Sequence, residues 1–115
     1  LNIGQVLERA EPYFDYLSPM VYPSHYPDGY NGFANPAAKP YEVIKLSMDS
    51  AVKRLLAASS SPFKLRPWLQ DFDLGANYDA AMIRKEKQAV YDAGLNSWLL
   101  WSPSNKYTVG ALDKK

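Results

Sequence analysis

The sequence predicts an α/β protein with three parallel βα units. Strand-length apolar segments, each ending in polar and aromatic side chains, lie near residues 13–22, 64–72 and 96–101. Segments with the apolar spacing of amphipathic helices alternate with them, near residues 3–11, 40–58 and 79–93. This alternation is typical of parallel sheets, whose functional groups gather at the carboxyl ends of the strands.

Three βα units are too few to close a barrel, because the common form needs eight. The chain of 115 residues is therefore either a small open α/β domain or about three-eighths of a (β/α)8 barrel. Since it starts at Leu1 and enters a helix-like segment at once, we expect a fragment of a longer protein; the alternative is a processed or trimmed complete domain. The unpaired edges of such a sheet predict self-association, or pairing with the missing half of a barrel.

Charge and composition narrow the classes of function. Thirteen basic and twelve acidic residues leave a net charge of +1, which argues against nucleic acid or an anionic membrane as a partner. No apolar run approaches the roughly 20 residues that span a bilayer. The absence of cysteine excludes disulfides and thiolate chemistry but leaves the compartment open. His25 is the only histidine, and the glycines form no phosphate-binding motif, so we expect no metal and no cofactor.

The first unit begins with a predicted helix over residues 3–11, in which Ile3, Val6 and Leu7 share one face. A strand is expected over 13–22. Pro19 lies inside it and removes a donor from the ladder, so we expect a bulge or a sheet edge at that point. A long loop rich in turn residues follows the strand.

The second unit begins at Pro40, which suits the first turn of a helix. One apolar stripe follows at helical spacing and comprises Tyr41, Ile44, Met48, Ala51, Val52 and Leu55. The predicted helix covers residues 40–58, and the predicted strand 64–72 ends beside Asp71.

The third helix is predicted over residues 79–93, with Asp79 as its N-cap and Gly94 directly after its end. Its inner face is expected to comprise Ile83, Val90 and Tyr91. The residues expected mostly to face water are Arg84, Lys85, Glu86 and Lys87. The strand over 96–101 is apolar on both faces, as a covered parallel strand requires.

Glycoside hydrolysis is the chemistry that the carboxylates fit best, because it needs two carboxyl groups roughly 5–10 Å apart. Asp71 is the main candidate, since it follows a strand and an aromatic segment; the alternative role is to cap the following loop. Weaker candidates for the second carboxylate are Asp28, Glu42 and Asp73. Solvated helix faces are the expected setting of Glu8, Glu11, Asp49 and Glu86.

Aromatic side chains strengthen the sugar interpretation, because flat rings with polar handles suit sugar faces. Those near predicted strand ends are Tyr22, Tyr26, Trp68 and Trp101; core packing is the alternative for some of them, and Trp98 is assigned to the core. His25 either binds a substrate hydroxyl or tethers the long loop. Gln70 and Asn105 are neutral hydrogen-bonding groups of the kind that sugar sites use, and loop satisfaction is the alternative for Asn105.

Four stretches carry a resemblance over nearly the whole chain. They are SPMVYPSHY at 18–26, PYEVI at 40–44, RPWLQDF at 66–72, and AG at 93–94 followed by WLLWSPSNKYT at 98–108. In this order and spacing the chain resembles a bacterial glycosyl hydrolase family, a domain of unknown function with an amylase-like TIM barrel. The family often has asparagine where this chain has Ser102.

The resemblance implies that residues 1–115 are the C-terminal part of the barrel, covering strands six to eight. The parent would be a glycoside hydrolase acting on a polysaccharide or oligosaccharide, with the extracellular space or cell envelope of a bacterium as the favoured setting. The partner carboxylate of Asp71 would lie in the missing part, so the isolated chain is expected to be inactive. The implied site residues are Tyr22, His25, Tyr26, Trp68, Gln70, Asp71, Trp101 and Asn105.

Two other interpretations remain open at this point. The barrel can instead be a non-catalytic module that binds glycans or the cell wall. The chain can also be a remnant with its own assembly and no native function.

Overall fold

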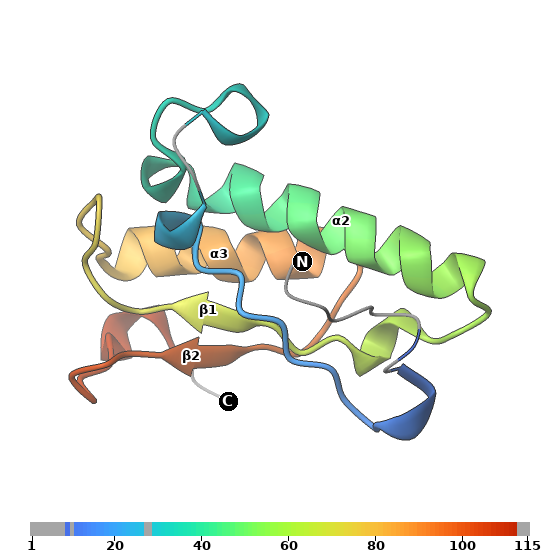
Figure 1. The fold of residues 1–115 in the computed structure, drawn as a ribbon. Helices are drawn as coiled ribbons and strands as arrows, with labels where there is room; N and C mark the ends of the chain where they lie inside the picture. The colour runs from blue at the N-terminus through green and yellow to red at the C-terminus, as the bar shows by residue number, and fades with distance from the viewer. Residues whose placement is uncertain (1–8, 10, 27–28, 113–115) are drawn as a thin grey trace.

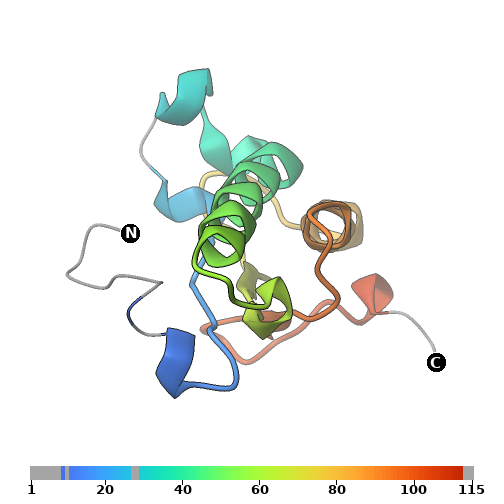
Figure 2. The same ribbon diagram turned by 90° about the vertical axis from the view of Figure 1, so that its right-hand side faces the viewer.

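The computed structural model describes residues 9, 11–26 and 29–112 of the chain. Helix α2 spans Pro40–Ala57 and helix α3 spans Ala80–Asp92. Strands β1 (Trp68–Gln70) and β2 (Leu99–Trp101) pair in parallel, with Leu69 opposite Leu100. Both helices lie on the same side of this sheet (Figures 1 and 2). The chain is therefore a mixed helix and strand structure with a parallel pair, whereas three complete βα units are not seen in the described residues.

Short 3-10 helices occupy the connections. They are η1 (Glu11–Tyr13), η2 (Pro23–His25), η3 (Tyr30–Gly32), η4 (Pro36–Ala38), η5 (Pro62–Lys64) and η6 (Val109–Ala111). Three of them lie in the segment expected to be a long loop before α2. The predicted helix over 3–11 falls almost entirely outside the described residues; Arg9 is helical, and Glu11 begins η1.

An extended segment over residues 17–21 runs beside β1, on the edge opposite β2. Leu17 pairs with Leu65 and Met20 pairs with Trp68, both in parallel. Both bridges join residues 48 positions apart in the sequence, so no extra residue is inserted between them. Pro19 therefore lies in an edge segment, as one of the two expectations had it, and not in a bulge. Pro19 accepts from the Trp68 N–H at 2.9 Å but has no N–H to donate. The prediction of a continuous strand over 13–22 is therefore wrong, and only isolated bridges form.

The other two strands are also shorter than predicted. The expected strand over 64–72 is paired continuously only in β1, because Lys64 closes η5 and Pro67 has no N–H for the ladder. Pro67 still accepts from the Leu99 N–H at 2.9 Å. The strand expected over 96–101 is regular only in β2.

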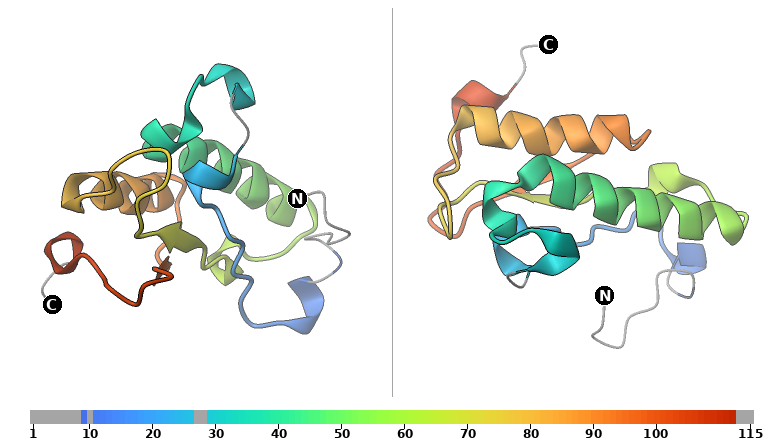
Figure 3. Two further views of the ribbon diagram at one scale, coloured as in Figure 1. Left: turned by 60° about the vertical axis from the view of Figure 1, so that its left-hand side comes forward. Right: turned by 90° about the horizontal axis from the view of Figure 1, so that it is seen from above.

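Helix α2 has the apolar stripe that its sequence predicts. Ile44, Met48 and Leu55 are fully buried against the sheet, and Pro40 forms the first turn. The right-hand view of Figure 3 shows α2 and α3 lying side by side over the paired segments. The core between these layers comprises Val21, Ile44, Met48, Leu55, Leu65, Leu69, Ala89, Val90 and Leu95.

Helix α3 starts and ends as predicted. The Asp79 carboxylate accepts a hydrogen bond from the Met82 N–H at 3.0 Å, which caps the first turn. Gly94 follows the helix with φ of 87°, a left-handed conformation that favours glycine.

The faces of α3 differ from the prediction in three residues. Glu86 and Lys87, expected to face water, are 0% and 3% exposed, whereas Tyr91, expected to face inward, is 42% exposed. Ile83 and Val90 are both fully buried, and positions three and four residues after Ile83 share its face. The helical period thus carries Glu86 and Lys87 into the interior.

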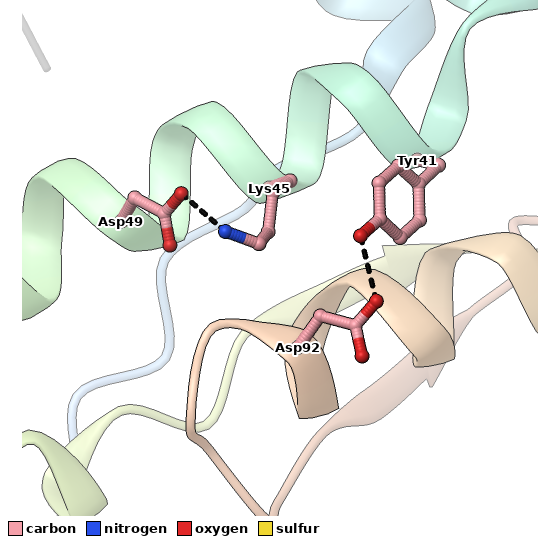
Figure 4. Close-up of polar contacts among 4 residues, drawn as sticks. All are labelled: Tyr41, Lys45, Asp49 and Asp92. Atoms are coloured by element: carbon pink, nitrogen blue, oxygen red, sulfur yellow. Dashed lines mark hydrogen bonds and ion pairs between the residues drawn. The ribbon is translucent and has the colours of Figure 1, made fainter.

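The exposed side of the two helices carries polar contacts that join them (Figure 4). The Tyr41 hydroxyl on α2 donates to the Asp92 carboxylate on α3 at 2.6 Å. Hydrogen bonds from Tyr41 and then Gln88 lower the pKa of Asp92. Lys45 and Asp49 pair within α2 at 2.6 Å, and Asp49 is solvated as expected. Because these groups are exposed, they contribute little to stability.

Candidate functional site

The carboxyl ends of the paired segments meet at one end of the molecule. In Figure 1 both strand arrows point towards the end where η2, the connection after β1 and η6 lie. The left-hand view of Figure 3 shows the same grouping from another side. We call this region the rim and define it by Tyr22, His25, Gln70, Asp71 and Trp101. Parallel strands bring such residues together because their ends share one edge.

An aromatic cluster forms where the 17–21 segment and β1 end. The ring centroids of Tyr22 and His25 lie 5.3 Å apart, and those of Tyr22 and Phe72 lie 5.5 Å apart, both edge to face. Burial raises the pKa of the Tyr22 hydroxyl, and Tyr107 raises it further. Tyr22 is buried and His25 is exposed, so the cluster presents the imidazole to solvent over a packed aromatic base.

Gln70 connects the two segments at the rim. Its side chain is fully buried. The Gln70 Oε1 accepts from the Ser24 N–H at 3.1 Å, and its Nε2 donates to the Phe72 carbonyl at 3.0 Å. The amide oxygen therefore holds η2 against the end of β1, and the amide nitrogen fixes the chain just after Asp71.

Asp71 lies directly after β1 and is 4% exposed. Its Oδ2 accepts from the Thr108 N–H and its Oδ1 accepts from the Thr108 hydroxyl, both at 2.7 Å. Thr108, which precedes η6, thus ties its segment to the strand end. The contact is structural, but it joins Asp71 to a segment 37 residues later, whereas the foreseen alternative was a cap of the loop directly after Asp71. The Thr108 contacts leave the carboxylate almost fully covered.

Trp68 and Trp101 lie on the face of the sheet away from the helices. The register puts Trp68 opposite Leu99 and Gln70 opposite Trp101, and alternate residues point to opposite faces. The indole centroids are 6.3 Å apart in an edge-to-face pair. Trp101 is 42% exposed, so this face offers an indole to a ligand at the rim.

Tyr26 and Asn105 are not brought into this group. The Tyr26 hydroxyl contacts the Ser47 hydroxyl on α2 at 2.8 Å, and its ring lies 4.7 Å from that of Tyr30. Burial is the main cause that raises the pKa of Tyr26. Asn105 is exposed in a left-handed turn with φ of 59°, and its N–H donates to the Ser102 carbonyl at 3.1 Å.

A cavity of about 530 Å³ lies between the 17–21 segment and α2. Its lining includes Met20, His25, Tyr26, Ser47 and Arg54. His25 therefore belongs both to the rim and to the mouth of this cavity, whereas Tyr26 lines only the cavity. The rim, which contains Tyr22, and the cavity, which Tyr26 lines, are therefore separate parts of the candidate site.

A second carboxyl group, that of Glu86, contacts the rim directly, although the sequence predicted it to face solvent. Its Oε1 accepts from the Gln70 N–H at 2.8 Å. Burial raises the pKa of Glu86 well above its ordinary value; the Gln70 N–H opposes this shift, and the charge of Asp71 adds to it. Asp71 and Glu86 are the two buried carboxyl groups among the described residues.

The other proposed partner carboxylates lie in different settings. Glu42 is exposed in the first turn of α2. Asp73 accepts from the Tyr78 N–H at 2.7 Å and so supports the loop before α3. Asp28 lies outside the described residues. Within the ranges that the structure describes, no three histidine or acidic side chains gather as a metal site.

Sequence reasoning missed Glu86, Phe72 and Thr108. A signal for Glu86 exists, because it lies between Ile83 and Val90 in the helical period. Phe72 follows Asp71 directly and is detectable only as part of the aromatic run. Nothing in the sequence pairs Thr108 with Asp71, since 37 residues separate them.

Comparison with protein families identifies the family of this chain. The family described as "Putative glycosyl hydrolase domain" matches residues 1–107. No curated protein and no solved structure matches. In the described part of the chain, no helix combines the length and apolar character that a membrane crossing requires.

Proposed function

The chain belongs to the putative glycosyl hydrolase domain family, and from this premise we propose that its rim forms part of a site that binds and cleaves a polysaccharide or oligosaccharide. The observation that carries the proposal is the convergence of Tyr22, His25, Gln70, Asp71 and Trp101 at the carboxyl ends of three parallel segments. This set combines aromatic rings, a neutral hydrogen-bonding group and a carboxylate, which are the groups that sugar chemistry uses.

The aromatic groups supply the binding surface. Trp101 presents a partly exposed indole, and the Tyr22, His25 and Phe72 cluster presents an exposed imidazole whose Nδ1 contacts the Ser24 hydroxyl at 3.1 Å. Indole rings gain apolar contact with the C–H face of a pyranose while their N–H remains available for a hydrogen bond. The proposed ligand is therefore a neutral sugar chain that lies across the rim.

Asp71 is the carboxylate proposed to act on the glycosidic bond, either as acid/base or as nucleophile. Its two hydrogen bonds to Thr108 fix the orientation of the carboxylate. The same contacts cover it, so the proposal requires the Thr108 segment to open when sugar binds. A second carboxylate is needed across the bond, roughly 5–10 Å away, and we propose that it comes from outside this chain.

A larger barrel provides the setting for that second carboxylate. The described sheet has the 17–21 segment at one edge and β2 at the other, and unpaired edges favour addition of further strands. We propose that additional parallel strands continue the sheet and bring the remaining catalytic groups to the same rim. The 115-residue chain alone is then expected to bind sugar weakly and to release no product.

Trp101→Ala tests the binding surface. The variant is expected to weaken oligosaccharide affinity roughly 3- to 10-fold, because an aromatic contact contributes about 0.5–1.5 kcal/mol beyond the area that it buries. Isothermal titration of the chain with cellohexaose, maltohexaose and chitohexaose measures the change. Tyr13→Ala is the matched control, since Tyr13 is 82% exposed in η1, away from the strand ends. Equal affinity loss in both variants would remove Trp101 from the site.

A further inference from the structure

The interior of the rim contains a carboxyl group that none of the proposed chemistry uses. Glu86 is 0% exposed. Its Oε2 is buried and has no hydrogen-bond partner among the described residues, while its Oε1 accepts from the Gln70 N–H. A charged carboxylate in this position would leave an oxygen unpaired in a medium that solvates it poorly. The environment therefore favours the uncharged acid.

The Gln70 N–H that Glu86 accepts lies at a specific point of the backbone. Along the edge with the 17–21 segment, Arg66 donates to Leu17 and Trp68 donates to Pro19. The parallel pattern repeats every second residue, so Gln70 is the next donor and Val21 would be its acceptor. Its N–H instead turns to Glu86. The Glu86 side chain of α3 thus takes the place of Val21 as acceptor, and the hydrogen-bond ladder between β1 and the 17–21 segment ends at the rim.

The contact extends beyond the strand through the Gln70 side chain. That side chain accepts from the Ser24 N–H and donates to the Phe72 carbonyl. Ser24 lies beside His25, and Phe72 packs on Tyr22 at 5.5 Å. A continuous series of hydrogen bonds therefore runs from Glu86 through Gln70 to the aromatic cluster.

We propose that Glu86 is a positioning residue of the rim: its uncharged carboxyl fixes the end of β1 at Gln70, and Gln70 in turn fixes Ser24 and Phe72. Loss of the Glu86 proton would place a buried charge under the strand end, with Oε2 left unpaired. The Gln70 N–H favours that charge, but its burial would destabilise the folded rim as a whole. The inference rests on the proposed function only in its last step, which is that an ordered rim binds sugar more tightly.

The groups that act on the Glu86 proton come from several elements. Asp71 at the end of β1 and Tyr78 before α3 both interact electrostatically with it. Lys87, the next residue on α3, donates to the Ala111 carbonyl at 2.7 Å. Helix η6 has no titratable side chain. On α2, Lys45 and Asp49 form an exposed ion pair with each other. The negative charge of Asp71 thus opposes ionisation of Glu86.

The direction of the pH effect follows from these contacts. Burial raises the pKa of Glu86 in the folded protein, so the folded chain holds this proton more tightly than the unfolded chain. The stability that Glu86 contributes is therefore complete below about pH 4.3, the ordinary glutamate value, and is lost as the pH rises through the folded pKa. The order at Ser24 should decline over the same interval.

Amide hydrogen exchange measured by NMR tests the inference without reference to activity. In the wild-type chain, the protection factor of the Ser24 amide is expected to fall as the pH rises above about 5. In Glu86→Gln, which keeps an uncharged acceptor of the same size, it is expected to stay constant. Glu86→Ala is expected to lower the protection of Gln70 and Ser24 at least about tenfold, because a buried donor loses its acceptor.

Val90→Ala is the matched control, since Val90 is fully buried on the same helix and its apolar side chain cannot hydrogen-bond to Gln70. It should lower protection throughout the core without singling out Ser24. A pH dependence of Ser24 in Glu86→Gln that equals that of the wild type would overturn the inference, even if Glu86→Ala fails to fold.

A titration with cellohexaose, maltohexaose and chitohexaose separates this inference from the proposed function. The expected result is that the wild-type chain binds one of them and that its affinity falls at high pH, while Glu86→Gln retains its affinity. Absence of binding by the wild-type chain, with Ser24 behaving as expected, would sink the proposed function and support the Glu86 contact. Affinity that is unaffected by pH and identical in wild type and Glu86→Ala would sink the positioning role and leave the proposed function standing.

Discussion

Asp71→Asn is expected to lower glycosidic hydrolysis about 10²- to 10⁴-fold in a complete, active protein that contains this chain, which is the range that a positioned acid or base contributes. The substitution is well suited to the site. The asparagine oxygen can accept from the Thr108 N–H, and the asparagine amide can donate to the Thr108 hydroxyl. The hydroxyl then acts as an acceptor instead of a donor. The charge is removed while both contacts to Thr108 remain.

The measurement is the initial rate of reducing-end release from one polysaccharide at fixed protein concentration. Thr108→Val serves as the control for the contact itself, because it keeps the backbone donor to Asp71 and removes the hydroxyl. It is expected to change hydrolysis far less than Asp71→Asn. Turnover of Asp71→Asn at the wild-type rate would remove Asp71 from the mechanism.

Leu55→Ala is expected to lower the free energy of unfolding by about 2–5 kcal/mol, since truncation of a buried leucine loses apolar transfer energy and leaves a cavity. Leu55 is fully buried in the core cluster under α2. A domain of ordinary stability has only about 5–15 kcal/mol in total, so the variant should be close to unfolding. Urea denaturation followed by circular dichroism measures the loss.

The neighbouring residue provides the control for this variant. Leu56 is 59% exposed on the same helix, so Leu56→Ala should change the unfolding free energy by no more than about 0.5 kcal/mol. The contrast between adjacent leucines tests whether α2 packs on the sheet with the face described here. Equal destabilisation by the two variants would contradict this packing.

The sequence was a good guide to the helices because their signals are local. The stripe containing Ile44, Met48 and Leu55 repeats with the helical period, and Asp79 has the side chain that an N-cap needs. The strands were predicted too long. Pro19 and Pro67 remove backbone donors, and regular pairing is confined to three residues each in β1 and β2.

The candidate site was less accessible to sequence reasoning. That Tyr22, His25, Gln70 and Asp71 lie near one another follows from the parallel arrangement, which the sequence predicts. The partner of a side chain does not follow from it. The Tyr26 hydroxyl contacts the Ser47 hydroxyl on α2, and this contact depends on the path of the loop between the 17–21 segment and α2.

For Glu86, the charge of the side chain and the helical spacing of the apolar residues predict opposite positions on α3. A glutamate among Arg84 and Lys85 suggests a solvated face, and a buried carboxyl is uncommon. The helical period predicts the opposite, and the structure follows the period. A buried acid next to a strand end is thus a feature that residue type alone conceals.

The central claim is that the ends of the three parallel segments form one sugar-binding rim. Chemical-shift mapping of the ¹⁵N-labelled chain with cellohexaose, maltohexaose and chitohexaose tests it most directly. The account predicts that one of these sugars shifts the amides of Tyr22, Ser24, His25 and residues 70–72 and 101–102 together, with a single affinity. Shifts confined to the opposite end of the molecule, around η1 and η5, or shifts at only one of the three segments, would contradict it.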